Sequence, residues 1–208
     1  MIDIPRSAAT HTVISKEKFY QVSSADTKIK RLFVDEVEKI TLRGAIAART
    51  MNVSAGAYEE LDIIEVQLKG SDVSKQVLET IDGVIPRPVL FVLVRDGGDT
   101  KYVISYKEPK AKELTKSKVI QYFETAWNAD APLIKGSSVK AIYINFIEQI
   151  DPSFDKAKPI AEAVAYTKQI AKIRADIATL NSRIKNEPST AKRQELARER
   201  HTLEERLR

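Results

Sequence analysis

The sequence predicts an α+β fold in which a mixed, largely antiparallel sheet is flanked by helices and followed by a C-terminal helical hairpin of coiled-coil type. Between residues 15 and 150, segments with the period-2 pattern of strands alternate with segments of helical period. Pro152 and Pro159 then interrupt the chain. Beyond them an apolar residue recurs every three or four positions. We therefore expect an α/β globular domain over residues 1–152 and a basic helical hairpin over residues 159–208.

Two helices are expected near the start of the chain. Ser15 can cap a short helix that ends at Val22. The following segment has apolar residues at spacings of three and four, which predicts a helix with one apolar face made by Ile29, Leu32, Phe33, Val37 and Ile40. Residues 41–56 contain alanines that suit a helix and Thr and Val that suit a strand, so this stretch remains unassigned.

The first predicted strand covers Leu61–Leu68 and has two distinct faces. Ile64, Val66 and Leu68 form one face, and Glu65, Gln67 and Lys69 form the other. A helix is expected from about residue 74 to residue 81, after which Pro86 and Pro88 require extended backbone. The run PVLFVLVR that begins at Pro88 is continuously apolar up to its final arginine, which predicts a central strand buried on both faces.

The second half of the domain begins with a hairpin. Asp96-Gly97-Gly98-Asp99 is a strong turn signal, so Lys101–Glu108 should return antiparallel to the central strand. Residues 119–127 alternate as a strand does, although an amphipathic helix is not excluded. Residues 139–150 should form a helix that packs on the sheet. The side chains expected in the core are Ile81, Ile85, Phe91, Leu93, Ile142, Phe146 and Ile150.

The clearest periodic pattern in the chain lies in the C-terminal part. Its apolar positions follow heptad spacing and include an interaction seam made of Tyr166, Ile170, Ile173, Ile177, Leu180 and Ile184. Asn186-Glu187-Pro188-Ser189 ends this helix, and a second, more charged helix is expected over residues 190–207. The seam requires something to pack on, which is the second helix, another copy of the chain or a different protein.

All of the surplus positive charge belongs to this C-terminal part. Residues 166–208 contain 11 Lys and Arg against 6 Asp and Glu, whereas the rest of the chain is balanced at 23 against 23. The residues that could contact nucleic acid are Lys168, Lys172, Arg183, Lys192, Arg193 and Arg198. Because the cations occupy several sides of the helices, solubility and helix pairs such as Arg200 with Glu204 are the favoured explanation.

Composition argues against several classes of function. The chain has no cysteine, and His11 and His201 lie near opposite ends, so neither a zinc–thiolate site nor a Ser-His-Asp triad is expected. There is no GxGxxG or GxxxxGK[ST] motif to hold a nucleotide. We expect no cofactor and no bound metal. With neither a membrane span nor a signal-type start, we expect a cytoplasmic location.

One catalytic alternative is carried by the first predicted strand. Asp62, Glu65, Gln67 and Lys69 resemble the strand of the restriction-nuclease superfamily that binds a divalent cation. That chemistry also needs an acidic residue from a neighbouring strand, and no Asp or Glu occurs between Glu38 and Glu59. An ordinary half-exposed strand is therefore the favoured interpretation. A basic, tyrosine-lined sheet surface for stacking on bases is a further alternative, made by Lys69, Tyr102, Tyr106 and Lys107.

The segment Glu79–Leu93, ETIDGVIPRPVLFVL, resembles the signature of an uncharacterised prokaryotic family, domain of unknown function 4391. The resemblance spans roughly residues 16–150. It is supported by the preceding IIEVQLK, by the pair Tyr106-Lys107 at a strand end and by the closing helices. The pattern Tyr122-x-x-Thr125-x-Trp127 also supports the resemblance.

The resemblance implies an accessory role, because members of this family are encoded beside helicase and DNA-methyltransferase genes in restriction-like phage-defence loci. No catalytic residues are established for the family, so none can be assigned here. We therefore expect a non-catalytic accessory or scaffolding subunit whose hairpin engages a second copy, a helicase or a methyltransferase. A nucleic-acid-binding or metal-dependent nuclease subunit that uses the Glu65 and Lys69 face is the alternative.

Overall fold

The computed structural model describes residues 1–22, 26–55, 58–108 and 118–207. The chain divides into two compact units, residues 1–152 and residues 153–208. The first unit contains all the strands of the described residues, and the second contains two helices.

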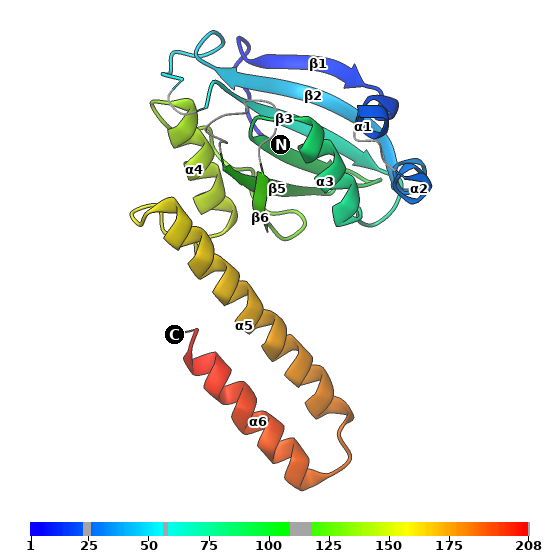
Figure 1. Cartoon of the computed structure of the whole chain (residues 1–208), viewed down its shortest axis with the longest axis vertical. Helices are drawn as coiled ribbons and strands as arrows, with labels where there is room; N and C mark the ends of the chain where they lie inside the picture. Colours follow the sequence, from blue (N-terminus) through cyan, green and yellow to red (C-terminus); the bar gives the residue numbers. More distant parts are fainter. Residues whose placement is uncertain (23–25, 56–57, 109–117, 208) are drawn as a thin grey trace. The chain divides into compact units, whose positions relative to one another are not determined.

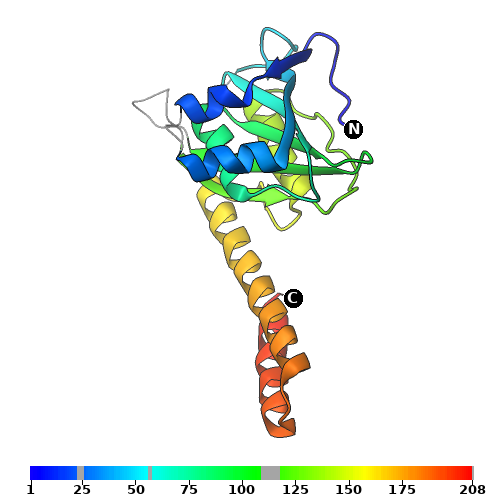
Figure 2. The ribbon, with the colours of Figure 1, turned by 90° about the vertical axis from the view of Figure 1, so that its right-hand side faces the viewer.

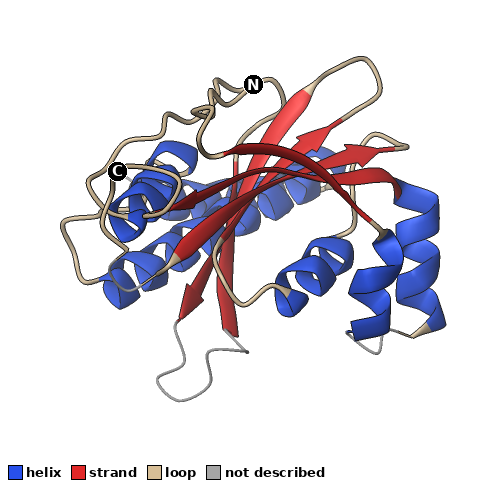
Figure 3. Cartoon of the chain, turned by 90° about the horizontal axis from the view of Figure 1, so that it is seen from above, coloured by secondary structure: helices blue, strands red, loops and turns tan. Residues whose placement is uncertain are grey.

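A six-stranded sheet forms the first unit (Figures 1 and 3). Its strands are β1 (Ala9–Ile14), β2 (Val37–Ala47), β3 (Glu60–Leu68), β4 (Val89–Val94), β5 (Thr100–Glu108) and β6 (Lys118–Glu124). Spatial order follows chain order from β1 to β6. Among the strand pairs of the described residues, β3 and β4 are parallel and the others are antiparallel, and α3 (Lys75–Val84) connects β3 to β4. The predicted fold class, a mixed and largely antiparallel sheet with helices and a C-terminal helix pair, is confirmed.

Helices cover both faces of this sheet. α1 (Lys16–Val22), α2 (Thr27–Glu36) and α3 pack on one face through Phe19, Phe33 and Ile81. α4 (Val139–Ile150) lies on the other face. Strand β5 shows the division, because Tyr106 stacks on Tyr143 of α4 while the next side chain, Lys107, reaches the end of α3. The view along the sheet in Figure 3 shows helices on both sides of the strands.

The boundary between α2 and β2 differs from the prediction. Asp26 caps α2 by accepting a hydrogen bond from the backbone N–H of Ile29 at 2.8 Å, and the helix ends at Glu36. Val37 and Ile40, which we expected on the helix, lie in β2 and are fully buried. Their spacing fits a helix face, but these two residues are β-branched and β2 runs between two neighbouring strands. The unassigned stretch from residue 41 therefore continues this strand to Ala47.

Strand β1 was not predicted at all. It is the edge strand beside β2, and most of its side chains are exposed, so it has no apolar face that the sequence could reveal. Residues 119–124 form strand rather than the alternative helix, although β6 ends at Glu124 instead of Trp127.

Most of the predicted core residues are buried. Phe91, Ile81 and Leu93 are at most 1% exposed, whereas Ile85 at the end of α3 is only partly buried. Ile142, Phe146 and Ile150 of α4 are buried, as expected. The predicted hairpin turn between β4 and β5 forms, and Gly97 and Gly98 have the positive φ values of 97° and 92° that favour glycine there.

The second unit is a helical hairpin. α5 (Ile160–Asn186) and α6 (Thr190–Glu205) lie side by side and antiparallel (Figures 1 and 2). Of the predicted seam, Ile170, Ile173 and Leu180 are buried, Ile177 and Ile184 are partly buried, and Tyr166 is 44% exposed. Arg200 of α6 donates a hydrogen bond to Asn181 of α5 at 3.1 Å. Among the described residues, no helix has the length and apolar character needed to cross a membrane.

Candidate functional site

The four residues of the catalytic alternative do not converge on one site. All of them belong to β3 or follow it directly, but Asp62 faces the side covered by α3, whereas Glu65 and Gln67 face the other side. Asp62 is buried, with 2% of its surface exposed, and Gln67 and Lys69 are exposed. A cation held by Glu65 would therefore not be reached by Asp62.

Glu65 is already neutralised by a cation of the protein. Its carboxylate lies 2.5 Å from Nη1 of Arg43 on the neighbouring strand β2. Arg43 therefore occupies the strand from which a metal-dependent nuclease would supply its second carboxylate. Lys69 lies 3.9 Å from Glu38. Within the described part of the chain, no group of three or more Asp, Glu or His side chains is arranged to hold a metal ion.

Asp62 instead belongs to a row of alternating charges at the start of the parallel pair β3–β4. Nε of Arg87, which precedes β4, lies 2.6 Å from Oδ2 of Asp62 and 3.2 Å from Oε1 of Glu60. Glu60 also pairs with Arg49. Because parallel strands begin at the same edge of a sheet, the start of β3 and the residues before β4 are brought together here. The row runs from the exposed Arg49 to the buried Asp62.

The carboxyl group of Asp62 is the most perturbed acid in this row. Burial removes it from water and raises its pKa to about 6, and the neighbouring Arg87 opposes this change only in part. Oδ1 of Asp62 is buried and has no hydrogen-bond partner in the structure. A carboxyl group with one unpaired oxygen and a pKa near 6 could exchange a proton close to neutral pH, but its side chain is closed to solvent.

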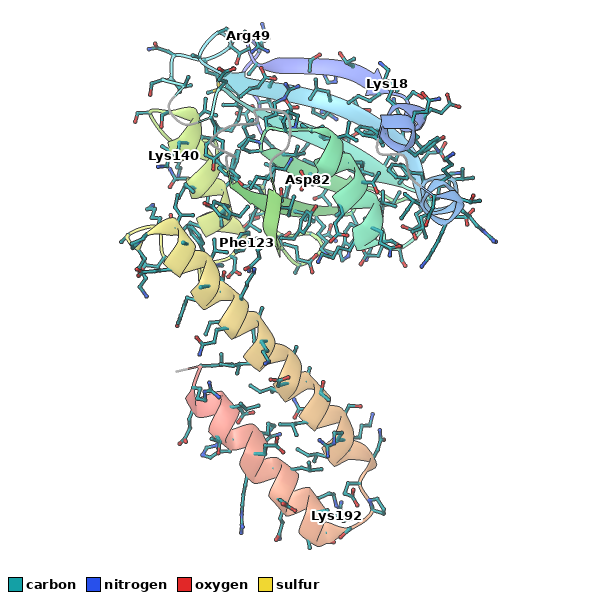
Figure 4. All side chains as sticks on the ribbon, viewed as in Figure 1. Lys18, Arg49, Asp82, Phe123, Lys140 and Lys192 are labelled. Carbon is teal, nitrogen blue, oxygen red and sulfur yellow. The ribbon has the colours of Figure 1, made fainter. Side chains whose placement is uncertain are left out.

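A second buried network joins three segments that are distant in the sequence. Nζ of Lys107 on β5 lies 2.7 Å from Oδ1 of Asp82 on α3, and Tyr122 on β6 donates a hydrogen bond to Oδ2 of Asp82 at 2.8 Å. The side chains of Lys107 and Asp82 are 1% and 0% exposed. Burial lowers the pKa of Lys107, while the pKa of Tyr122 is raised by burial and then by the charge of Asp82. Figure 4 labels Asp82 on α3.

Lys107 caps the C-terminal end of α3. Its amine donates hydrogen bonds to the carbonyl oxygens of Asp82, Ile85 and Arg87 at 2.9, 2.6 and 2.8 Å. Carbonyl groups at a helix end lack partners within the helix and carry partial negative charge, so an ammonium group is favoured there. All three N–H groups of the charged amine are used in these bonds. The network therefore stabilises the fold and leaves no N–H free for chemistry.

This network changes the interpretation of the predicted basic, tyrosine-lined sheet surface. Lys107, Tyr102 and Tyr106 are all buried, and only Lys69 of that group is exposed. The backbone N–H of Lys107 donates to the hydroxyl of Tyr143 at 2.9 Å, so both the main chain and the side chain of this residue are bound inside the protein. The group cannot stack on bases. Its burial could not be foreseen because the partner carbonyls belong to the end of another element.

The segments that carry the family resemblance meet in and beside this network. Asp82, Lys107 and Tyr122 form it, and the hydroxyl oxygen of Thr125 accepts a hydrogen bond from the N–H of Tyr102 at 3.1 Å. Trp127 packs under the guanidinium of Arg95, which lies 3.6 Å from the ring centroid. These positions are accounted for by interactions that hold the sheet and α3 together.

The hairpin carries the remaining predicted residues. The six residues proposed for nucleic-acid contact are all exposed. Figure 4 labels one of them, Lys192, near the turn between α5 and α6. The seam and the cations thus lie on different sides of the same two helices.

Comparison with known proteins adds one finding. The family model described as a domain of unknown function (DUF4391) matches residues 2–207, which is almost the whole chain. No curated protein and no solved structure matches the chain.

Proposed function

The chain belongs to the DUF4391 family, and from this premise we propose that it is a non-catalytic accessory or scaffolding subunit of a DNA-processing phage-defence system. The partner in this proposal is a helicase or a DNA methyltransferase, and the helical hairpin is the element that contacts it. The observation that supports a non-catalytic role most directly is the separation of Asp62 from Glu65 on opposite faces of β3.

The charges around the two carboxylates support the same conclusion. Glu65 is paired with Arg43 and Asp62 with Arg87, each at 2.5 to 2.6 Å between nitrogen and oxygen. A catalytic divalent cation would need to displace one of these arginines. Asp62 has Glu60 beside it on the same face, but Arg87 lies between the two carboxylates, and among the described residues no third Asp, Glu or His joins them to hold a metal ion.

The unequal lengths of the two hairpin helices support contact with another protein. α5 has 27 residues and α6 has 16, so at 1.5 Å per residue they are about 40 and 24 Å long. The short turn between them places α6 beside the C-terminal part of α5. The first turns of α5 therefore extend past α6. Tyr166 lies in this extension with 44% of its surface exposed, and aromatic side chains of this kind often anchor interfaces.

The test of the partner is affinity capture of the tagged full-length chain from its native host, followed by mass spectrometry. We expect a helicase or a methyltransferase encoded by the same locus to be captured. Tyr166→Ala should lose it, whereas Val34→Ala should not, because Val34 is a comparably exposed apolar residue (53%) on α2. Equal capture by both variants would contradict the role of the hairpin, and absence of both partner classes would contradict the proposal.

A separate assay tests the absence of catalysis. We expect the purified chain with Mg²⁺ or Mn²⁺ to cleave neither duplex nor single-stranded DNA or RNA, and Glu65→Gln to keep its partner. Metal-dependent cleavage that disappears in Glu65→Gln would establish the nuclease alternative instead.

A further inference from the structure

The two units differ in how many of their basic residues form ion pairs. Among the described residues of the first unit nine Lys and Arg do so, and several others, among them Lys28 and Lys140, are exposed without an ion pair; the nine are Arg31, Arg43, Arg49, Lys69, Lys75, Arg87, Arg95, Lys101 and Lys107. Among residues 166–207, all of which the structure describes, Arg200 with Glu204 is the only Lys or Arg in an ion pair. The surplus charge of the hairpin is therefore both exposed and uncompensated by the protein itself.

Three of these unpaired cations share one side of α5. Lys168, Lys172 and Arg183 are separated by 4 and 11 residues, which are close to one and three turns of a helix with 3.6 residues per turn. They fall within roughly 60° around the helix axis and extend over about 22 Å along it. The buried seam residues lie roughly 120° away around the axis. Asp176 follows Lys172 by one turn but forms no ion pair with it among the described residues.

A second pair of unpaired cations provides an internal comparison. Arg174 and Lys185 are also exposed and also 11 residues apart, but they lie on a different side of the same helix. Each pair, Lys172 with Arg183 and Arg174 with Lys185, contains one lysine and one arginine. The two pairs thus have the same charge and the same spacing, and they differ in the face of α5 that they occupy.

We propose that the face of α5 formed by Lys168, Lys172 and Arg183 binds the phosphate backbone of duplex DNA. Exposed lysines and arginines without protein partners bind phosphates with release of counterions, and this binding is independent of base sequence. Binding to single strands usually adds aromatic side chains on which bases stack. Tyr166 is the one Phe, Tyr or Trp in the sequence from 160 to 208, and it lies roughly 160° around the axis of α5 from Lys168. This inference deepens the proposed function by naming a nucleic-acid contact for the accessory subunit.

The proposal is tested by fluorescence anisotropy of a labelled 20-base-pair duplex with the full-length chain between 50 and 200 mM salt. We expect Lys172→Gln/Arg183→Gln to reduce the slope of log K against log salt by about 1.8, which corresponds to two phosphate contacts. The matched variant Arg174→Gln/Lys185→Gln should change the slope by less than about half of that amount. Far-UV circular dichroism should show unchanged helix content in both variants, since all four residues are exposed.

Three results would overturn the proposal. The first is failure of the wild-type chain to bind the duplex at 50 mM salt, the second is an equal reduction of the slope by the two double variants, and the third is binding of a polyglutamate peptide in place of the duplex. The last result would assign this face to an acidic protein. Tyr166→Ala separates this test from that of the proposed function, because it should abolish partner capture without changing the salt dependence of DNA binding.

Discussion

Lys107 is a basic residue that lies buried inside the fold. Its position explains why an acidic residue, Asp82, and several backbone carbonyl groups surround its amine. The amine needs hydrogen-bond acceptors, and it finds three carbonyl oxygens: Asp82 in the last turn of α3, Ile85 at its C-cap and Arg87 in the segment before β4. Asp82 supplies the compensating charge, and Tyr122 satisfies its other oxygen. The burial of an ion pair is tolerated when its remaining polar groups are bonded in this way.

Replacement of Lys107 by Met should destabilise the protein by about 3 to 5 kcal/mol, because the change leaves Asp82 as an uncompensated buried charge and three carbonyl groups without their donor. Chemical denaturation with urea measures the loss. Lys75→Met on α3 is the control, since Lys75 pairs with Glu79 at the surface, with side chains 71% and 49% exposed, and should cost under about 1 kcal/mol. A similar loss in both variants would show that Lys107 has no special role.

Asp62 should make stability depend on pH in an unusual direction. Its pKa of about 6 in the folded protein exceeds its ordinary value of 3.8, so the folded state holds the proton more tightly than the unfolded state. The corresponding stability is fully present below pH 3.8 and is lost as the pH rises to about 6. At 1.36 kcal/mol per unit, the change is about 3 kcal/mol.

Asp62→Asn should remove this dependence. The measurement is the free energy of unfolding of both proteins at intervals between pH 4 and pH 7, since other groups contribute equally to both curves. We expect the difference between the wild type and the variant to change steadily up to pH 6 and then to become constant. Parallel curves across the whole range would contradict the assignment.

Among the elements, those with a clear apolar pattern could be predicted from the sequence, and those defined by their neighbours could not. β3, β4, β5 and α4 were expected close to their observed positions because their side chains meet the core in a regular period. The end of α2 was misplaced because Val37 and Ile40 satisfy a helical spacing as well as the alternation of β2. β1 is held by pairing with β2 rather than by burial, and its residues therefore carry no pattern.

The central position of β4 leads to a prediction about Phe91. This residue is fully buried between β3 and β5, opposite Ile64 and Val103. Phe91→Ala should reduce the free energy of unfolding by about 3 to 5 kcal/mol, as expected for a large cavity in a core. Val34→Ala on the exposed side of α2 should change it by less than about 0.5 kcal/mol. A loss below about 1 kcal/mol at Phe91 would mean that this strand is not central.

At the scale of the whole molecule, the sequence predicted the fold class and the hairpin more readily than any site. Charge counts along the sequence located the surplus cations. They could not show which of these cations lack an ion pair, because pairing depends on side chains of neighbouring turns and strands. The networks around Asp62 and Lys107 were hidden for the same reason. Asp82, Lys107 and Tyr122 come from three different elements, so no sequence pattern predicts that their side chains are in contact.

The division into two units predicts that residues 1–152 fold without the hairpin. The sheet, the helices on its faces and both buried networks are complete within this range. We expect the fragment 1–152 to unfold in a single cooperative transition in urea, with coincident curves from circular dichroism and from the fluorescence of Trp127. Non-coincident curves would show that the first unit depends on residues 153–208.

The order of the strands also bears on how the chain is made. Because each strand lies beside the one synthesised just before it, the sheet can grow by one strand at a time while the ribosome is still adding residues. The C-terminal end of α3 is the exception, since the carbonyl groups of Asp82 and Ile85 gain their donor only when Lys107, more than twenty residues later, has been added. We therefore expect α3 to gain its full stability only after β5 has been synthesised.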